Sequence, residues 1–188
     1  MLLQPAYRLQ QTPLYRSVLG TVIDDDEAAM QLALALADQA AEWQEVPVGA
    51  LVLDERREII GMGLNQTIYV QDPTQHAEIA ALRDAAARRG NYRLPNCQLF
   101  VTLEPCMMCM GAILHARLQR VVYGASDPKT GVCHSVLKHE QYASLNHHTE
   151  IIGGVLAERC AQQLSAFFQA RRAEQKQKKL SIKNEIRS

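Results

Sequence analysis

Helical and strand-like segments alternate along most of the chain, and this alternation limits the folds that the sequence can adopt. Helices are expected from the acidic cap at 24–27 to about Trp43, from His76 to Gly90, from Cys106 to about Arg117, and from about Val155 into the C-terminal segment. Strands are expected at 47–53, 59–64, 98–103, 120–124 and 149–152, the first two joined as a hairpin by the polar turn 54–58. The pattern predicts an α/β protein, a three-layer sandwich of helices around a mixed five-stranded sheet.

The length of 188 residues favours one main domain, which we expect at residues 24–170. Residues 1–23 show no clean periodicity and contain two prolines, so we expect a mobile N-terminal extension that lies outside the core. Residues 171–188 are expected to form a basic helix end or tail.

Composition excludes several classes of protein. No apolar run approaches the roughly 18 to 20 residues that a membrane-spanning helix needs. The N-terminus lacks the basic-then-apolar pattern of a secretion signal. Five cysteines without such a signal indicate reduced thiols or metal ligands rather than a disulfide framework. We therefore expect a cytoplasmic protein that does not contact a membrane.

The net charge of zero conceals an asymmetry along the chain. Residues 1–54 balance to −6 and residues 55–188 to +6. The stretch 168–188 alone carries seven basic and two acidic residues. A basic end on a neutral protein fits either a local contact with a polyanion or a solvated helix end.

The segment Pro105-Cys106-Met107-Met108-Cys109 begins a predicted helix directly after a strand. Cysteines three residues apart lie on one helix face, close enough to hold one metal ion, and a helix N-terminus favours the thiolate. Taken alone, this spacing is compatible with half of a structural zinc site or with a redox pair.

His76 begins another predicted helix and adds a third ligand to the two cysteines. A structural zinc site is closed by four protein ligands, whereas a catalytic site keeps three and leaves one position for water. The remaining cysteines are solitary and are expected to be small buried hydrophobes: Cys97, Cys133 and Cys160. His76, Cys106 and Cys109 therefore predict one Zn²⁺ per subunit, with water in the fourth position.

Glu78 follows His76 by two residues, and residues so spaced do not share a helix face. The two side chains serve one site only if that site lies beyond the helix tip, where first-turn side chains converge. There Glu78 would take a proton from the bound water and pass it to a leaving group. His-x-Glu followed by Pro-Cys-x-x-Cys is the signature of zinc nucleobase deaminases.

Several further segments, in the same order, resemble bacterial tRNA-specific adenosine deaminases, over roughly residues 25–180. They are EVPVGA at 45–50, DPTQHAE at 72–78, NYRL at 91–94, TLEPC at 102–106, DPKTG at 127–131, and Phe167-Phe168 with Arg171-Arg172. The resemblance implies a cytidine-deaminase-like α/β/α sandwich, a homodimer, and conversion of adenosine to inosine at the wobble position of a tRNA anticodon. The implied partner is a tRNA anticodon stem-loop, and no organic cofactor is implied.

Carried over by position, the resemblance also implies roles for single residues. His76, Cys106 and Cys109 would bind zinc, and Glu78 would carry the proton. Six further residues would contact the nucleoside or the RNA: Asn65, Asp127, Lys129, Phe168, Arg171 and Arg172. Because aromatic side chains stack on bases and arginines bind phosphates, the basic end then favours RNA contact. The chain departs from the family pattern at Ser126 and at 132–135.

Three other interpretations are compatible with part of the pattern. A deaminase of a free base or nucleoside, of the cytosine or guanine type, would share the sandwich and the metal motif but would not need the basic last helix. A non-catalytic zinc-stabilised RNA-binding module would not need Glu78. A thiol redox protein would use Cys106 and Cys109 and would stay active without zinc.

Overall fold

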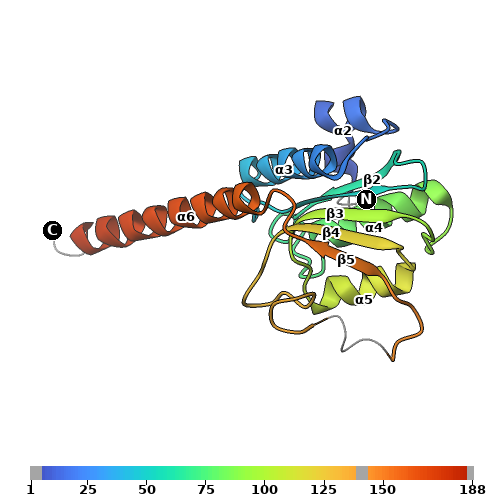
Figure 1. The fold of residues 1–188 in the computed structure, drawn as a ribbon. Coiled ribbons are helices and arrows are strands. Elements are labelled where there is room, and N and C mark those ends of the chain that lie inside the picture. Colours follow the sequence, from blue (N-terminus) through green and yellow to red (C-terminus); the bar gives the residue numbers. More distant parts are fainter. Residues whose placement is uncertain (1–5, 139–143, 186–188) are drawn as a thin grey trace.

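A computed structural model of the chain describes residues 6–138 and 144–185, and it contains a five-stranded sheet in the order β2-β1-β3-β4-β5 (Figure 1). The strands are β1 (Gly49–Leu53), β2 (Ile59–Leu64), β3 (Gln98–Leu103), β4 (Arg120–Ala125) and β5 (Glu150–Gly153). Strand β1 is antiparallel to both of its neighbours, whereas β3, β4 and β5 are parallel to one another. The predicted mixed sheet is confirmed, with strand bounds that differ by at most two residues.

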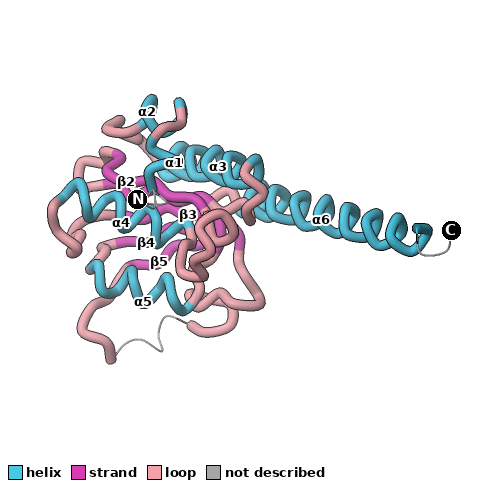
Figure 2. Tube along the Cα trace, turned by 180° about the vertical axis from the view of Figure 1, so that it is seen from behind, coloured by secondary structure: helices cyan, strands magenta, loops and turns pink. Residues whose placement is uncertain are grey.

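Helices cover both faces of this sheet. Helix α3 (Asp26–Glu42) lies on one face, and α4 (Ala77–Arg89) and α5 (Met107–Ala116) lie on the other (Figures 1 and 2). Helix α6 (Ala157–Glu185) begins against the face that α3 covers and then leaves the body as a long projecting helix. In the described ranges, no helix is both long enough and apolar enough to cross a membrane.

Two apolar cores separate the three layers. Successive side chains of a strand point to opposite faces, so β1 gives Ala50 and Val52 to the core under α4 and α5, and Leu51 and Leu53 to the core under α3. All four side chains are fully buried. The near-continuous apolar sequence of β1 is therefore explained by helices on both sides.

Helix α4 lies directly on β2 because that strand carries glycines at the contact. A Cβ at Gly61 would come 2.6 Å from the carbonyl oxygen of Ala81, and a Cβ at Gly63 would come 2.2 Å from that of Ala77. No real side chain fits at either distance. The two glycines thus fix where α4 lies, and with it the position of His76 at its N-terminus.

The expectation that residues 1–23 lie outside the core is wrong for the described part of that segment. It forms two short helices, α1 (Ala6–Gln10) and α2 (Pro13–Val18). Leu9 and Tyr15 are only 2% and 3% exposed and belong to the core under α3. Helices this short leave no recognisable periodicity in the sequence. Residues 1–5 of the expected extension, and 186–188 of the expected tail, lie outside the described residues.

Candidate active site

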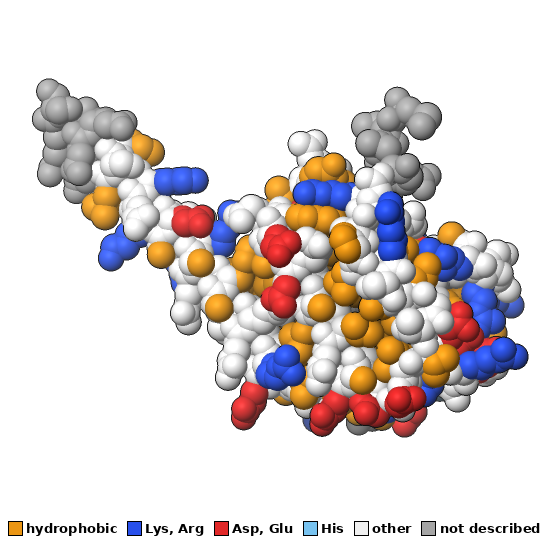
Figure 3. All heavy atoms as spheres, turned by 90° about the horizontal axis from the view of Figure 1, so that it is seen from above, with side chains coloured by type: hydrophobic (Ala, Val, Ile, Leu, Met, Phe, Trp, Pro, Cys, Tyr) orange, Lys and Arg blue, Asp and Glu red, His pale blue; other side chains and the backbone are white. Residues whose placement is uncertain are grey.

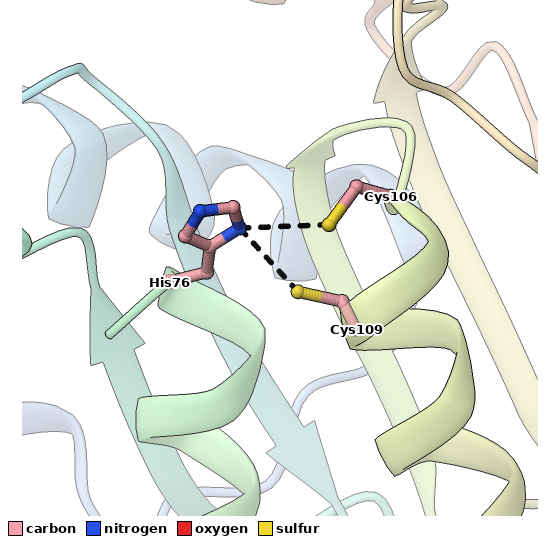
Figure 4. A group of neighbouring side chains, drawn as sticks. All are labelled: His76, Cys106 and Cys109. Carbon is pink, nitrogen blue, oxygen red and sulfur yellow. Dashed lines mark hydrogen bonds between the residues drawn. The ribbon is translucent and has the colours of Figure 1, made fainter. Parts of the chain in front are cut away.

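The predicted metal ligands meet at the N-termini of α4 and α5, which lie side by side on one face of the sheet (Figure 4). His76 is the N-cap residue of α4 and Cys106 that of α5, so each helix begins one residue later than the sequence predicts. Nδ1 of His76 lies 3.7 Å from Sγ of Cys106 and 3.5 Å from Sγ of Cys109. The three ligand atoms lie within 4.8 Å of one another.

These separations fit a zinc ion. Zinc–nitrogen bonds of about 2.0 Å and zinc–sulfur bonds of about 2.3 Å, at a tetrahedral angle, place nitrogen and sulfur roughly 3.5 Å apart. One imidazole and two thiols are also a donor set that zinc prefers. Within the described part of the chain, this cluster comprises these three residues and does not include Glu78.

The pKa values of the two thiols are shifted in opposite directions. The hydrogen bond from the Cys109 thiol, with a further contribution from His76, lowers the pKa of the Cys106 thiol to about 4. Donating to Cys106, together with burial, raises the pKa of Cys109. The hydrogen bond to Cys106 likewise raises the pKa of His76. A bound cation would displace the proton of the Cys109 thiol, because thiolates rather than thiols bind metal.

Glu78 lies in the first turn of α4 and is 4% exposed. Burial raises the pKa of its carboxyl group above the ordinary value for glutamate. The side chain lines the same cavity as His76 and Cys106. A buried carboxyl group with a raised pKa at this place is suited to take up a proton and release it again.

The cavity above the cluster has a volume of about 580 Å³ and brings together five of the six predicted contact residues. Those five come from the loop after β2, the loop after β4 and helix α6: Asn65, Asp127, Lys129, Phe168 and Arg172. Ser126, where the sequence departs from the family pattern, lines it as well.

Two residues do not join the cavity. Arg171 is not among its lining residues, and its guanidinium lies 5.9 Å from the ring centre of Phe167. The predicted contact by Arg171 therefore receives no support from the cavity. His115 is exposed on α5 and does not line the cavity either.

Asn65 has a structural task that the sequence did not reveal. Its Oδ1 accepts a hydrogen bond of 2.9 Å from the backbone N–H of Ala77, and its side chain is buried. A free N–H at the start of a helix requires such an acceptor, and His76 provides no side-chain cap. Asn65 thus holds the turn that carries His76 and Glu78.

The Asp127 carboxylate organises its own loop. It accepts hydrogen bonds from the backbone N–H groups of Lys129 at 2.9 Å and Thr130 at 3.3 Å, and from the hydroxyl group of Thr130. These bonds leave the Lys129 side chain exposed at the cavity. Asp127 therefore acts in the structure by placing Lys129.

Sequence reasoning missed Glu104, which connects β3 to the loop after β4. It is 2% exposed, and its Oε1 accepts hydrogen bonds from three successive backbone N–H groups, those of Cys133, His134 and Ser135 at 2.7–3.0 Å. Its Oε2 accepts from the N–H of Asp127 at 3.0 Å and from the Ser135 hydroxyl group. Burial by itself would raise the pKa of Glu104, but these hydrogen bonds outweigh it and lower the pKa.

Glu104 also explains why residue 131 is a glycine and how the chain can depart from the family pattern at 132–135. A Cβ at Gly131 would come 2.4 Å from the carboxyl carbon of Glu104, so only glycine fits there. Cys133 is buried, as are Cys97 and Cys160, which confirms the prediction for all three solitary cysteines. Cys133 and His134 bond to Glu104 through their backbone N–H groups alone among the hydrogen bonds described, so these two positions tolerate unusual side chains. A glutamate directly before the Pro-Cys pair was the one sequence signal available.

Comparisons with known proteins agree with this geometry. Residues 23–125 match the family model of the cytidine and deoxycytidylate deaminase zinc-binding region. The tRNA-specific adenosine deaminase of Haemophilus influenzae is 53% identical over 159 residues, which are 85% of this chain and 92% of the relative. A solved structure from work on A-to-I editing by tRNA:A34 deaminases at the wobble position of transfer RNA is 40% identical, with a TM-score of 0.68, over 72% of this chain and 97% of its own.

A guanine deaminase from Nitrosomonas europaea is similar in fold alone. It is 22% identical, with a TM-score of 0.73, over 89% of this chain and 94% of its own. The sandwich therefore occurs together with different substrates, so it is the site that must distinguish among them.

Proposed function

Since the chain belongs to the cytidine and deoxycytidylate deaminase family, and within it to the tRNA-specific adenosine deaminases, we propose that it hydrolyses adenosine to inosine at the wobble position of a tRNA anticodon. The observation that carries the proposal is the single cavity that joins the His76–Cys106–Cys109 cluster and Glu78 to a rim with Phe168, Lys129 and Arg172.

His76, Cys106 and Cys109 are the residues that would hold zinc. Zinc bound there supplies a Lewis acid that lowers the pKa of a water molecule to about 7. Cys109 is fully buried, whereas His76 and Cys106 are partly exposed and line the cavity. The open side of the cluster therefore faces the space where a base would enter.

Glu78 is the proposed proton carrier. Its carboxylate accepts a proton from the attacking water and delivers it to the ring nitrogen of the base. It then accepts the second proton of that water, from the hydroxyl group added to the ring, and delivers it to the departing amine. One water is consumed and one ammonia is released, so that adenosine becomes inosine. Burial of Glu78 suits this task, because a raised pKa lets the group hold the proton between the two transfers.

The rim suits a single-stranded RNA loop. A base in an anticodon loop is splayed out at less cost than a base in a duplex. Phe168 is 40% exposed at the cavity and offers a stacking surface. Lys129 and Arg172 provide positive charge for the neighbouring phosphates. Asn65, which caps α4, lies in the wall that the nucleoside would contact.

We also propose a homodimer that works in the cytoplasm. Large apolar side chains are exposed on segments next to the metal ligands: Ile68 (59%) and Tyr69 (56%) before His76, and Met107 (54%) after Cys106. Such exposure beside a site supports a second subunit that covers it. Sedimentation of the zinc-loaded protein tests this, and a monomer at micromolar concentration would contradict it.

A panel of substrates tests the function. The zinc-loaded protein is expected to form inosine in an anticodon stem-loop with adenosine at the wobble position, and to release no ammonia from cytosine, guanine, cytidine or free adenosine. The basic helix α6 beside the cavity favours this outcome over a free-base deaminase, which has no use for it. Turnover of free guanine or cytosine, with none of the stem-loop, would overturn the proposal.

A further inference from the structure

One face of α6 runs without interruption from the cavity into the projecting part of the helix. Phe168 and Arg172 line the cavity, and Arg172, Lys176, Lys179 and Leu180 line a shallow groove of about 360 Å³ farther out. Residues three and four apart share a helix face. Arg172 belongs to both hollows, so the outer groove continues the cavity along the helix.

The basic side chains of α6 between residues 171 and 179 are divided between two faces. Arg172, Lys176 and Lys179 lie on the face that continues the cavity, and we call these three residues the basic row. Arg171 and Lys178 are seven residues apart and lie together on a different side, roughly 100° around the helix from Arg172. Glu174, midway between them, shares that side and offsets their charge. The sequence places no acidic residue on the face of the row between 164 and 180.

The charges of the row are not used inside the protein. Arg172, Lys176 and Lys179 are exposed, and they form no ion pair with the residues described at 6–138 and 144–185. The helix projects beyond the body, with basic side chains along it (Figures 1 and 3). Packing against α3, β3 and β4 involves only the part of α6 near the body. The row spans about 10 Å at 1.5 Å per residue.

We propose that the basic row binds the phosphate backbone of the double-stranded anticodon stem while the loop occupies the cavity. This inference rests on the proposed function, because the stem is the part of the RNA that adjoins the bound loop. A helical RNA presents its backbone to proteins and is recognised mainly by shape and phosphates. A row of cations on one helix face, continuous with the loop site, is complementary to such a backbone.

A pair of double variants isolates the row. Lys176→Ala/Lys179→Ala removes two charges from it, and Arg159→Ala/Lys178→Ala removes two charges from exposed positions of the same helix outside the row. Alanine favours helix, so both variants keep α6, which circular dichroism checks. Arg172 stays unchanged in both, because it also lines the cavity. The readout is the dissociation constant, measured across a series of salt concentrations.

Two RNAs separate stem from loop: the complete anticodon stem-loop, and the loop sequence as a single strand without a stem. The row variant is expected to bind the stem-loop on the order of tenfold more weakly than the wild type. The slope of the logarithm of its binding constant against the logarithm of salt concentration should be smaller in magnitude by about 1 to 2. Its affinity for the single strand should equal that of the wild type. The Arg159→Ala/Lys178→Ala variant is expected to stay within about twofold on both RNAs. Inosine formation at saturating stem-loop is expected to be unchanged in the row variant.

Each contrary outcome is distinct. If both double variants weaken binding of the stem-loop equally, the effect is a general one of charge, and the proposed role of the basic row is overturned. Equal weakening on both RNAs would place the contact at the loop rather than the stem and would also overturn it. If the row variant binds the stem-loop with unchanged affinity and salt dependence, and the wild type forms inosine, the proposed role of the row is wrong but the proposed function stands. Absence of inosine in the wild type would instead defeat the proposed function.

Discussion

The hydroxyl group of Tyr15 donates a hydrogen bond of 2.7 Å to Oδ2 of Asp84, a residue 69 positions away in the sequence. The same oxygen accepts a hydrogen bond of 3.1 Å from the backbone N–H of Met62 in β2. Burial and the hydrogen bond to Asp84 raise the pKa of Tyr15 to about 12, so the hydroxyl group keeps its proton. The N-terminal segment is thereby anchored to α4, the helix whose N-cap residue is His76.

Tyr15→Phe is expected to lower the free energy of unfolding by about 1 to 3 kcal/mol, because the buried Asp84 loses a donor. Urea unfolding measures the change. Tyr92→Phe is the control: Tyr92 is 64% exposed and accepts a hydrogen bond only from the neighbouring Arg93 among the described contacts, so a change within about 0.5 kcal/mol is expected. Equal effects of the two variants would show that the anchor does not stabilise the fold.

Cys109→Ser is expected to abolish zinc binding, because a serine hydroxyl group is not ionised at neutral pH and is a poor zinc ligand. Metal analysis of the purified protein measures the zinc content per chain. Cys160→Ala, at a buried cysteine in the other core, is expected to keep the wild-type content. Zinc retained at the wild-type level in Cys109→Ser would remove Cys109 from the proposed ligands.

Glu78→Gln is expected to reduce inosine formation about 10²- to 10⁴-fold, because an amide cannot accept and return the proton. Zinc content and affinity for the stem-loop are expected to stay at the wild-type level, since Glu78 is not part of the ligand cluster. Glu158→Gln, at an exposed position near the start of α6, serves as the control with full activity. Turnover of Glu78→Gln at the wild-type rate would exclude the proposed proton path.

Glu104→Gln is expected to destabilise the loop at 127–135 by about 2 kcal/mol or more, because the amide NH₂ group would face N–H donors on one side. The dissociation constant for the stem-loop should rise while zinc content is retained. Protease cleavage within 127–135 is the separate readout, and it should accelerate in this variant. Unchanged RNA affinity and unchanged cleavage would show that the loop does not depend on Glu104.

The ion pairs of Asp26 are expected to make the free energy of unfolding fall as the pH is lowered in the acid range. It pairs with Arg120 at 2.5 Å and with Arg57 at 3.2 Å, and the hydrogen bond to Arg120 is the main cause of the lowered pKa of its carboxyl group. A carboxyl group with a lower pKa in the folded than in the unfolded state stabilises the fold fully above the unfolded pKa of about 3.9. That stability disappears as the pH falls through the folded value.

Asp26→Asn is therefore expected to lower the free energy of unfolding at pH 7 and to lose less of it between about pH 4 and pH 2. Urea unfolding at each pH gives both curves. Asp24→Asn, at an exposed neighbouring position, is expected to follow the wild-type curve. Parallel curves for the wild type and Asp26→Asn would show that other groups cause the acid sensitivity.

The parts of the site that could be predicted are marked by sequence patterns confined to a few neighbouring residues. A helix start, a Cys-x-x-Cys spacing and a histidine two residues before a glutamate are each readable within a few positions. Glu104 was not predictable in the same way, because its hydrogen-bond donors lie 23 to 31 residues away. The burial of Leu9 and Tyr15 escaped prediction for the same reason, since their partners are distant and their helices are short.

The sequence alone determined the order of helices and strands from residue 24 onward and predicted a metal ligand set and a proton carrier, because periodicity and motif spacing are local properties of the chain. Only the tertiary structure decided that Arg172 faces the cavity while its neighbour Arg171 does not. Adjacent helical residues point about 100° apart, and the packing of α6 on the sheet chooses which of them faces the site. That choice depends on contacts between segments far apart in the chain, which no local pattern encodes.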